Sequence, residues 1–149
     1  MNNFLILLVF IAVLFLLSSW IIKNKMRGRK RVLIIDDDRA FAKLVKTNLT
    51  RQGYDALAAL DGQTGMHLAT FKKPHLIILD VILPDIKGWD VCAKLKEDSR
   101  TKDIPIIFLT VKDSPEDIRA ELEAGAIAHL TKPVSNQELL DQVGKILGE

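Results

Sequence analysis

The chain has 149 residues, enough for one domain with its own hydrophobic core and a short additional segment. Residues 1–31 carry six basic and no acidic side chains, which leaves 15 basic and 19 acidic residues, a net charge of −4, for the remainder. The overall charge of +2 therefore does not indicate a nucleic-acid-binding domain, and the single cysteine, Cys92, excludes an intramolecular disulfide.

Residues 4–22 form an apolar run without a charged side chain. As a helix this run is about 28 Å long, close to the hydrocarbon thickness of a bilayer. Basic residues follow it directly and none precedes it, so the positive-inside rule predicts residues 1–22 as a single transmembrane helix of the cytoplasmic (inner) membrane, with the following domain in the cytoplasm. A cleaved signal peptide and a buried or interfacial helix stay open as alternatives.

Residues 23–31 are predicted to form a basic linker, which spans about 30 Å when fully extended. From residue 32 the pattern alternates between short apolar runs and segments of helical periodicity. Strands are predicted at residues 32–35, 54–60, 76–80, 104–110 and 127–130, and helices at residues 41–53, 63–71, 88–95, 115–125 and 136–147. Asp38, Ser114 and Ser135 stand where side chains cap the first, fourth and fifth of these helices.

Strands that alternate with helices predict an α/β fold in which helices cover both faces of a parallel sheet. We expect residues 32–149 to form one doubly wound domain with five strands in the flavodoxin-like order 2-1-3-4-5. In that order the carboxyl ends of strands 1, 3, 4 and 5 meet around one crevice, where α/β proteins bind their ligands.

Polar side chains stand at the carboxyl end of each of these four strands. Asp36 and Asp37 come directly after the first strand, Asp80 and Thr110 end the third and fourth, and Lys132 comes shortly after the fifth. Clustered carboxylates raise one another's pKa, and a hard cation such as Mg²⁺ relieves the repulsion while it binds phosphate oxygens. An ammonium and a hydroxyl suit the same phosphate, and a carboxylate beside Mg²⁺ can act as a nucleophile towards phosphorus.

Four segments resemble the response-regulator receiver domain of two-component signalling: IIDDD (34–38), LDVILPDIKG (79–88), IIFLT (106–110) and HLTKPV (129–134). The resemblance covers residues 32–149 and has all four motifs in order. It implies that Asp80 is the phosphoacceptor and that Asp36, Asp37, Asp80 and the backbone carbonyl of Ile82 hold Mg²⁺. The implied donor is a phosphohistidine on a sensor histidine kinase or a histidine phosphotransfer protein.

The same resemblance implies that Lys132 pairs with the phosphoryl oxygens, that Lys132–Pro133 is a cis peptide, and that Thr110 moves towards the phosphoryl group as part of a switch. The chain departs from the family at several of these positions. The switch residue on the fifth strand is His129 where the family usually has Tyr or Phe, and Val111 replaces a smaller residue after Thr110. Ile82 and Lys112 occupy positions that tune phosphoryl lifetime, and apolar Ile82 suggests slow self-dephosphorylation.

These observations predict a membrane-tethered, single-domain response regulator, a self-phosphorylating and self-dephosphorylating phosphoacceptor, not a turnover enzyme. Because the chain ends just past the fifth helix of the domain, we expect no nucleic-acid partner and an output through an unknown downstream protein or onward phosphotransfer. The alternatives are a phosphorylation-independent interaction module docked at the membrane through residues 4–22, and a haloacid-dehalogenase-type hydrolase that uses Asp36 and Asp38. The acidic residues between positions 113 and 123 are expected to form a solvated helix face.

Overall fold

The computed structural model describes residues 3–111 and 114–148. The helices in this part of the chain are α1 (Asn3–Arg27), α2 (Arg39–Arg51), α3 (Gly62–Lys72), α4 (Gly88–Glu97), α5 (Pro115–Glu123) and α6 (Asn136–Leu147). The strands are β1 (Arg31–Ile35), β2 (Asp55–Ala59), β3 (Leu76–Leu79), β4 (Ile106–Thr110) and β5 (Ala128–Thr131).

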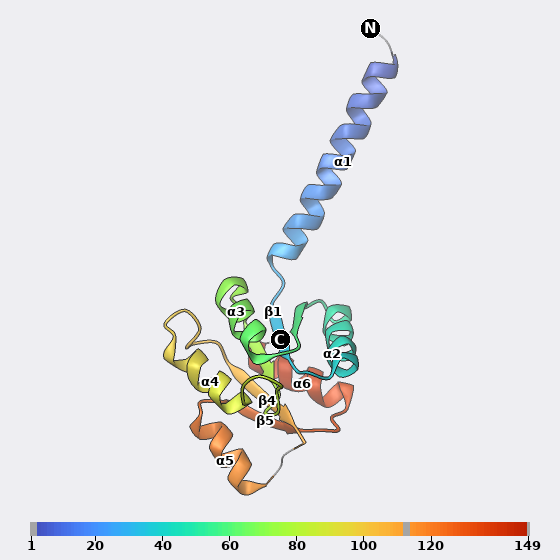
Figure 1. Ribbon diagram of the computed structural model, residues 1–149. Coiled ribbons are helices and arrows are strands. Elements are labelled where there is room, and N and C mark those ends of the chain that lie inside the picture. Colours follow the sequence, from blue (N-terminus) through green and yellow to red (C-terminus); the bar gives the residue numbers. More distant parts are fainter. Residues whose placement is uncertain (1–2, 112–113, 149) are drawn as a thin grey trace.

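The five strands form one parallel sheet in the order β2-β1-β3-β4-β5, so the predicted α/β topology is confirmed. Helices α3, α4 and α5 lie on one side of the sheet, and α2 and α6 lie on the other (Figure 1). Both faces of the central strands are therefore covered, which explains why β1, β3 and β4 are nearly continuous apolar runs.

Alternate side chains of the strands supply two separate cores. Val32 and Ile34 of β1 belong to the core beneath α2 and α6, whereas Leu33 and Ile35 belong to the core beneath α3 and α4. Gly65 weakens the helical pattern of α3 in the sequence, but a Cβ atom there would lie 2.5 Å from Cδ1 of Ile35. The absent side chain thus lets α3 pack closely on the sheet.

The predicted caps of three helices are confirmed. The side chain of Asp38 accepts a hydrogen bond from the backbone N–H of Phe41 at the start of α2. Ser114 and Ser135 cap α5 and α6 in the same way, through the backbone N–H groups of Asp117 and Glu138. Each cap satisfies one amide that the first turn of a helix leaves without a partner.

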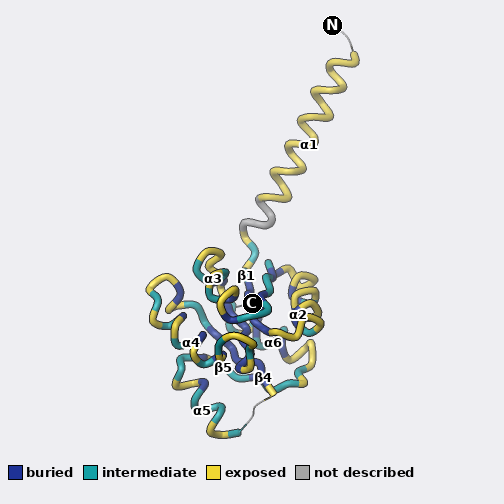
Figure 2. Tube along the Cα trace, in the orientation of Figure 1, coloured by how far each residue is buried: buried dark blue, intermediate teal, exposed yellow. Residues whose placement is uncertain are grey.

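Helix α1 is longer than the predicted membrane segment and the linker is correspondingly shorter. The helix continues through Arg27, because residues 23–27 contain no glycine or proline, and only residues 28–30 separate it from β1. Residues 3–23 are long and apolar enough to cross a membrane, with a mean hydropathy of 3.0 over an 18-residue window. Figure 2 shows α1 exposed over its described side chains, and every residue from 3 to 23 is exposed.

The direction of the sheet places α1 and the strand ends that carry the polar motifs at opposite edges. Helix α1 leads into the amino end of β1, and every strand of the sheet runs parallel to β1 (Figure 1). The carboxyl ends of the strands therefore lie at the edge that faces away from the start of the domain.

Candidate functional site

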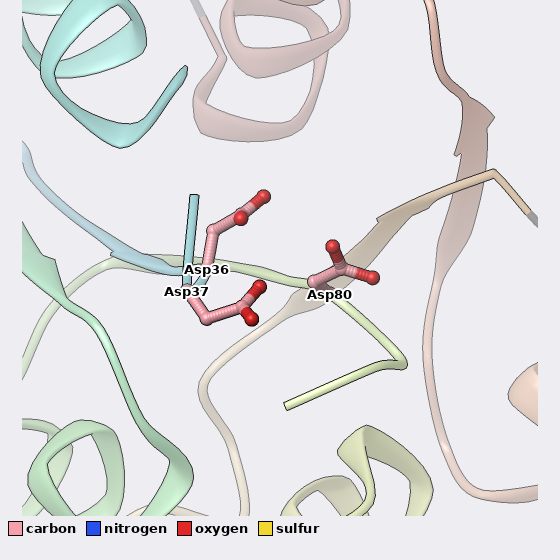
Figure 3. A group of neighbouring side chains, drawn as sticks. All are labelled: Asp36, Asp37 and Asp80. Atoms are coloured by element: carbon pink, nitrogen blue, oxygen red, sulfur yellow. The ribbon is translucent and has the colours of Figure 1, made fainter. Parts of the chain in front are cut away.

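Three carboxylates meet at the carboxyl edge of the sheet. Asp36 and Asp37 follow β1, and Asp80 follows β3, which is hydrogen-bonded to β1. One ligand oxygen from each side chain lies within 4.8 Å of the others, and Figure 3 shows the Asp36 and Asp37 side chains extending from one segment towards the side of Asp80. The neighbouring strands thus bring together the three acids that the sequence predicts as metal ligands.

Lys132 connects two of these carboxylates. Its Nζ atom lies 2.5 Å from Oδ2 of Asp36 and 2.8 Å from Oδ2 of Asp80, and it also lies 4.5 Å from the ring centroid of Phe41. The backbone N–H of Lys132 donates to the carbonyl of Thr110 at the end of β4, and the Lys132–Pro133 peptide is cis, as the family resemblance implies. Burial lowers the pKa of Lys132, but the bonds to Asp36 and Asp80 outweigh it and the pKa is raised.

The four side chains of this site carry more negative than positive charge. Burial raises the pKa of Asp36, and the hydrogen bonds from Lys132 and from the backbone N–H of Asp38 offset that only in part. When all four side chains are ionised, Lys132 and the three aspartates carry a net charge of −2. Oxygen ligands with this excess charge match the preferences of Mg²⁺, so the residues present fit the ion.

Solvent reaches the three acids unequally. Asp37 is exposed, whereas Asp36 is buried and Asp80 is only 8% exposed. The reason is that Asp80 turns towards Lys132 and also accepts a hydrogen bond at Oδ1 from the backbone N–H of Ile82, at 3.1 Å. The role of the Ile82 carbonyl as a metal ligand stays a prediction.

The loop between β3 and α4 is held close to the acids by contacts that the sequence did not reveal. Asp85 accepts hydrogen bonds from the backbone N–H groups of Gly62 and Gln63, both 2.8 Å long, and so caps α3 from a distant loop. These backbone donors lower the pKa of Asp85. A Cβ atom on Gly88 would lie 2.2 Å from the carbonyl oxygen of Asp80, so α4 can begin directly against the site only with glycine there.

Two predicted switch residues lie on adjacent strands. Thr110 ends β4 and is fully buried, and His129, on the neighbouring strand β5, pairs in register with Phe108.

The prediction of a solvated acidic face is wrong at Glu121 of α5, which is 0% exposed and contacts Nδ1 of His129 through Oε2. Nε2 of His129 lies 3.1 Å from the hydroxyl of Thr131. Val111 is exposed, and Lys112 lies outside the described residues.

Sequence and structure comparisons agree with this geometry. Residues 32–144 match the response regulator receiver domain family, and the chain therefore belongs to that family. It is 44% identical over 117 residues to the DNA-binding dual master transcriptional regulator RpaA of Synechocystis, covering 78% of this chain and 48% of RpaA. It is 40% identical over 118 residues to the alkaline phosphatase synthesis transcriptional regulatory protein PhoP of Bacillus subtilis, covering 79% of this chain and 48% of PhoP.

The fold matches that of solved receivers. The chemotaxis protein CheY4 of Vibrio cholerae superposes with a TM-score of 0.77 at 28% identity, over 80% of this chain and 99% of CheY4. Residues 32–144 thus form the receiver domain of a two-component response regulator. The chain spans about half the length of RpaA and PhoP, so the activities of those whole proteins do not follow from the match.

Proposed function

We propose that this protein accepts a phosphoryl group on Asp80 from a phosphohistidine of a sensor histidine kinase or a histidine phosphotransfer protein. The observation that carries the proposal is the convergence of Asp36, Asp37 and Asp80 within 4.8 Å, with Lys132 bonded to two of them. A carboxylate cluster alone would suit many cations, but the added lysine supplies a positive group for the oxygens of a phosphoryl ligand.

In the proposed step, a carboxylate oxygen of Asp80 forms a bond to phosphorus while the bond from phosphorus to the donor histidine nitrogen breaks. That nitrogen keeps the electron pair and takes up a proton. Lys132 stays beside the phosphorylated side chain because its Nζ atom is already 2.8 Å from Asp80. Asp36, Asp37, Asp80 and the carbonyl of Ile82 would hold Mg²⁺, which, when bound, neutralises charge on the phosphoryl oxygens.

We further propose that Thr110 and His129 transmit the change at Asp80. Thr110 is joined to the site through its carbonyl, which accepts a hydrogen bond from the backbone N–H of Lys132. His129 lies on the neighbouring strand and contacts buried Glu121 of α5. Because of this contact, a shift of β5 would move α5 as well. The output would be the binding of a protein partner or onward phosphotransfer, since residues 32–149 have a net charge of −4, unfavourable for nucleic acid.

We also propose that α1 anchors the protein in the cytoplasmic membrane, with the receiver in the cytoplasm. The support is the uncharged run at residues 4–22, its exposure along α1, and the basic residues that follow it. The hydroxyl of Ser18 donates to the carbonyl of Phe15 within the helix, so this polar group would not be unsatisfied in lipid. An anchor would raise the effective concentration of the receiver near membrane-bound kinases.

Beryllofluoride, which mimics a phosphoryl group on aspartate, tests the switch directly. We expect beryllofluoride with Mg²⁺ to change hydrogen exchange in α5 and β5 of the full chain, and Asp80→Asn to abolish the change. Lys43→Gln, a substitution of an exposed lysine on α2, serves as the control that should respond like wild type. An unchanged exchange pattern in wild type would support the phosphorylation-independent interaction module instead.

A further inference from the structure

The amino edge of the receiver sheet carries a concentration of positive charge. We call this surface the basic edge and define it by six residues on three neighbouring segments, Arg29, Lys30, Arg31, Arg51, Lys72 and Lys73. Because the strands are parallel, the last turns of α2 and α3 lie at the same edge as the start of β1. Residues far apart in sequence are therefore gathered where α1 joins the domain.

Hydrogen bonds hold these segments together. Nη1 of Arg31 donates to the carbonyl of Lys72 at 2.7 Å, and the backbone N–H of Arg31 donates to Nδ1 of His75 at 2.9 Å. On the other side, the backbone N–H of Asp55 donates to the carbonyl of Lys30 at 2.9 Å. The basic edge is thus a fixed surface of the folded domain, and Lys72 and Lys73 are exposed on it.

The charge of the basic edge is opposite to that of the domain as a whole. Asp55 is the acidic residue among these segments, and Arg31 neutralises it through a contact of 2.6 Å. Residues 32–149 nevertheless have a net charge of −4, and Asp36, Asp37 and Asp80 occupy the opposite edge. The basic edge, directed towards α1, and the acidic cluster, directed away from it, therefore lie at opposite ends of the domain.

An aromatic side chain stands beside the lysines. Phe71 in the last turn of α3 is 68% exposed, and its ring lies 4.4 Å from that of His67. An exposed aromatic next to basic residues is the combination that proteins use at the boundary between lipid headgroups and acyl chains. Phe71 is among the exposed large hydrophobic residues and belongs to neither core cluster of the described residues.

We propose that the basic edge docks on anionic lipid headgroups, with Phe71 inserted at the interface. This inference rests on the proposed anchor, because residues 23–27 extend α1 by about 8 Å beyond the membrane segment and residues 28–30 reach about 10 Å, which keeps the basic edge close to the bilayer. Docking would fix the orientation of the receiver, so that Asp80 and the metal ligands face the cytoplasm, where a phosphohistidine donor can approach.

A vesicle-binding experiment tests the surface without α1. Residues 28–149 suit it because both core clusters lie within residues 32–147 and none of the 3–23 segment is buried. We expect this fragment to bind vesicles with one third phosphatidylglycerol and not vesicles of phosphatidylcholine alone, and high salt to weaken the binding. Replacing Lys72 and Lys73 with Gln should lower partitioning roughly 25-fold, since each charge near an anionic surface contributes about a factor of five.

Two variants complete the comparison. Phe71→Ser should lower partitioning several-fold without lowering the thermal unfolding midpoint, because Phe71 is exposed. The double variant Lys43→Gln and Lys87→Gln removes the same charge from exposed positions outside the basic edge and should bind like wild type. Equal loss in both double variants, or equal binding to neutral and anionic vesicles, would overturn the proposal.

A measurement on the full chain separates the docking surface from the anchor. A nitroxide on Gln52→Cys, at the amino edge, should be less accessible to a water-soluble relaxation agent in anionic than in neutral nanodiscs. The same label on Asn136→Cys, at the opposite edge, should be equally accessible in both, and buried Cys92 should not react. If the chain enters nanodiscs but the label at position 52 is equally accessible in anionic and neutral ones, the docking proposal is contradicted and the anchor is not. If the chain fails to enter nanodiscs, the anchor is contradicted.

Discussion

Asp85 shows how one side chain can shape a site without touching the reacting atoms. Its two oxygens accept the first free backbone N–H groups of α3 and thereby tie the β3–α4 loop to that helix. We expect Asp85→Ala to lower the thermal unfolding midpoint and to weaken Mg²⁺ binding several-fold, because the loop that carries Ile82 loses its attachment. Calorimetric titration with Mg²⁺ measures the second effect.

Asp85→Asn is the matched variant, since its remaining carbonyl oxygen can still accept one of the two hydrogen bonds. It should fall between wild type and Asp85→Ala in Mg²⁺ affinity. Unchanged affinity in Asp85→Ala would show that the loop keeps its position without this contact.

Glu121 predicts a specific pH dependence of stability. Its burial raises its pKa, and the hydrogen bond with His129 offsets this only in part. The native state therefore binds the Glu121 proton more tightly than the unfolded chain does, so the resulting stabilisation is present below the ordinary glutamate pKa of about 4.3 and is lost as the pH rises through the higher native value. Glu121→Gln lacks this loss, so its free energy of unfolding relative to wild type should increase from about pH 4 to about pH 7.

Urea denaturation of both proteins across this pH range measures the difference. The slope of the difference with pH is the test, because ionisation of Glu121 changes the wild-type free energy of unfolding progressively as the pH rises, and Gln does not ionise. A difference that stays constant or decreases with rising pH would contradict the raised pKa.

The residues found from sequence and those missed differ in a physical way. Asp36, Asp37, Asp80 and Lys132 each follow a predicted strand, and parallel strands bring their carboxyl ends to one edge, so position along the chain was enough to group them. Asp85 caps a helix that begins 23 residues earlier, and local spacing contains no sign of such a contact.

Glu121 was missed for a related reason. Among the acidic residues of its helix it looked like one more solvated side chain, whereas the packing of α5 against β5 turns it inward to His129. The degree of side-chain burial depends on how a helix is rotated against its sheet, and the sequence of α5, with few large apolar residues, did not indicate that rotation.

The start of α4 depends on the absence of a side chain at Gly88. The backbone N–H of Gly88 donates to the carbonyl of Val81, and a Cβ atom would lie 2.7 Å from Cα of Val81. We expect Gly88→Ala to lower the free energy of unfolding by about 1–3 kcal/mol, because α4 or the loop must move to admit the methyl group. Urea denaturation provides the measurement.

Gly28→Ala is the appropriate control, since nothing lies within 4 Å of a Cβ atom at that position. It should leave the unfolding free energy of the receiver unchanged. If Gly88→Ala behaved like Gly28→Ala, the close approach of α4 to the site would not be a constraint.

The limits of the elements were predicted to within a few residues, with the largest difference at α1. Apolar runs marked β1, β3 and β4 because both faces of these central strands are covered. The end of α1 was misplaced because hydropathy changes at Lys23, whereas the helical backbone ends only where Gly28 follows. Hydropathy indicates whether a segment prefers lipid or water, whereas the end of a helix depends on the backbone preferences of its residues, here on Gly28.

The molecule as a whole places a candidate anchor at one edge of the receiver and the acidic site at the other. If α1 spans the membrane, the protein should remain in the pellet after alkaline carbonate extraction of membranes, and residues 28–149 expressed alone should be released. Protease added to the cytoplasmic side should digest the receiver but spare α1. Release of the intact full chain by carbonate would contradict the anchor, and loss of residues 1–22 from the mature protein would support a cleaved signal peptide.

Phosphotransfer to Asp80 is the measurement that tests the central assignment most directly. The full chain in nanodiscs would be mixed with radiolabelled, autophosphorylated histidine kinases and Mg²⁺, and wild type compared with Asp80→Asn. We expect at least one kinase to label wild type, with no label on Asp80→Asn and loss of labelling when a chelator removes Mg²⁺. Equal labelling of wild type and Asp80→Asn would contradict the assignment of Asp80 as the phosphoacceptor.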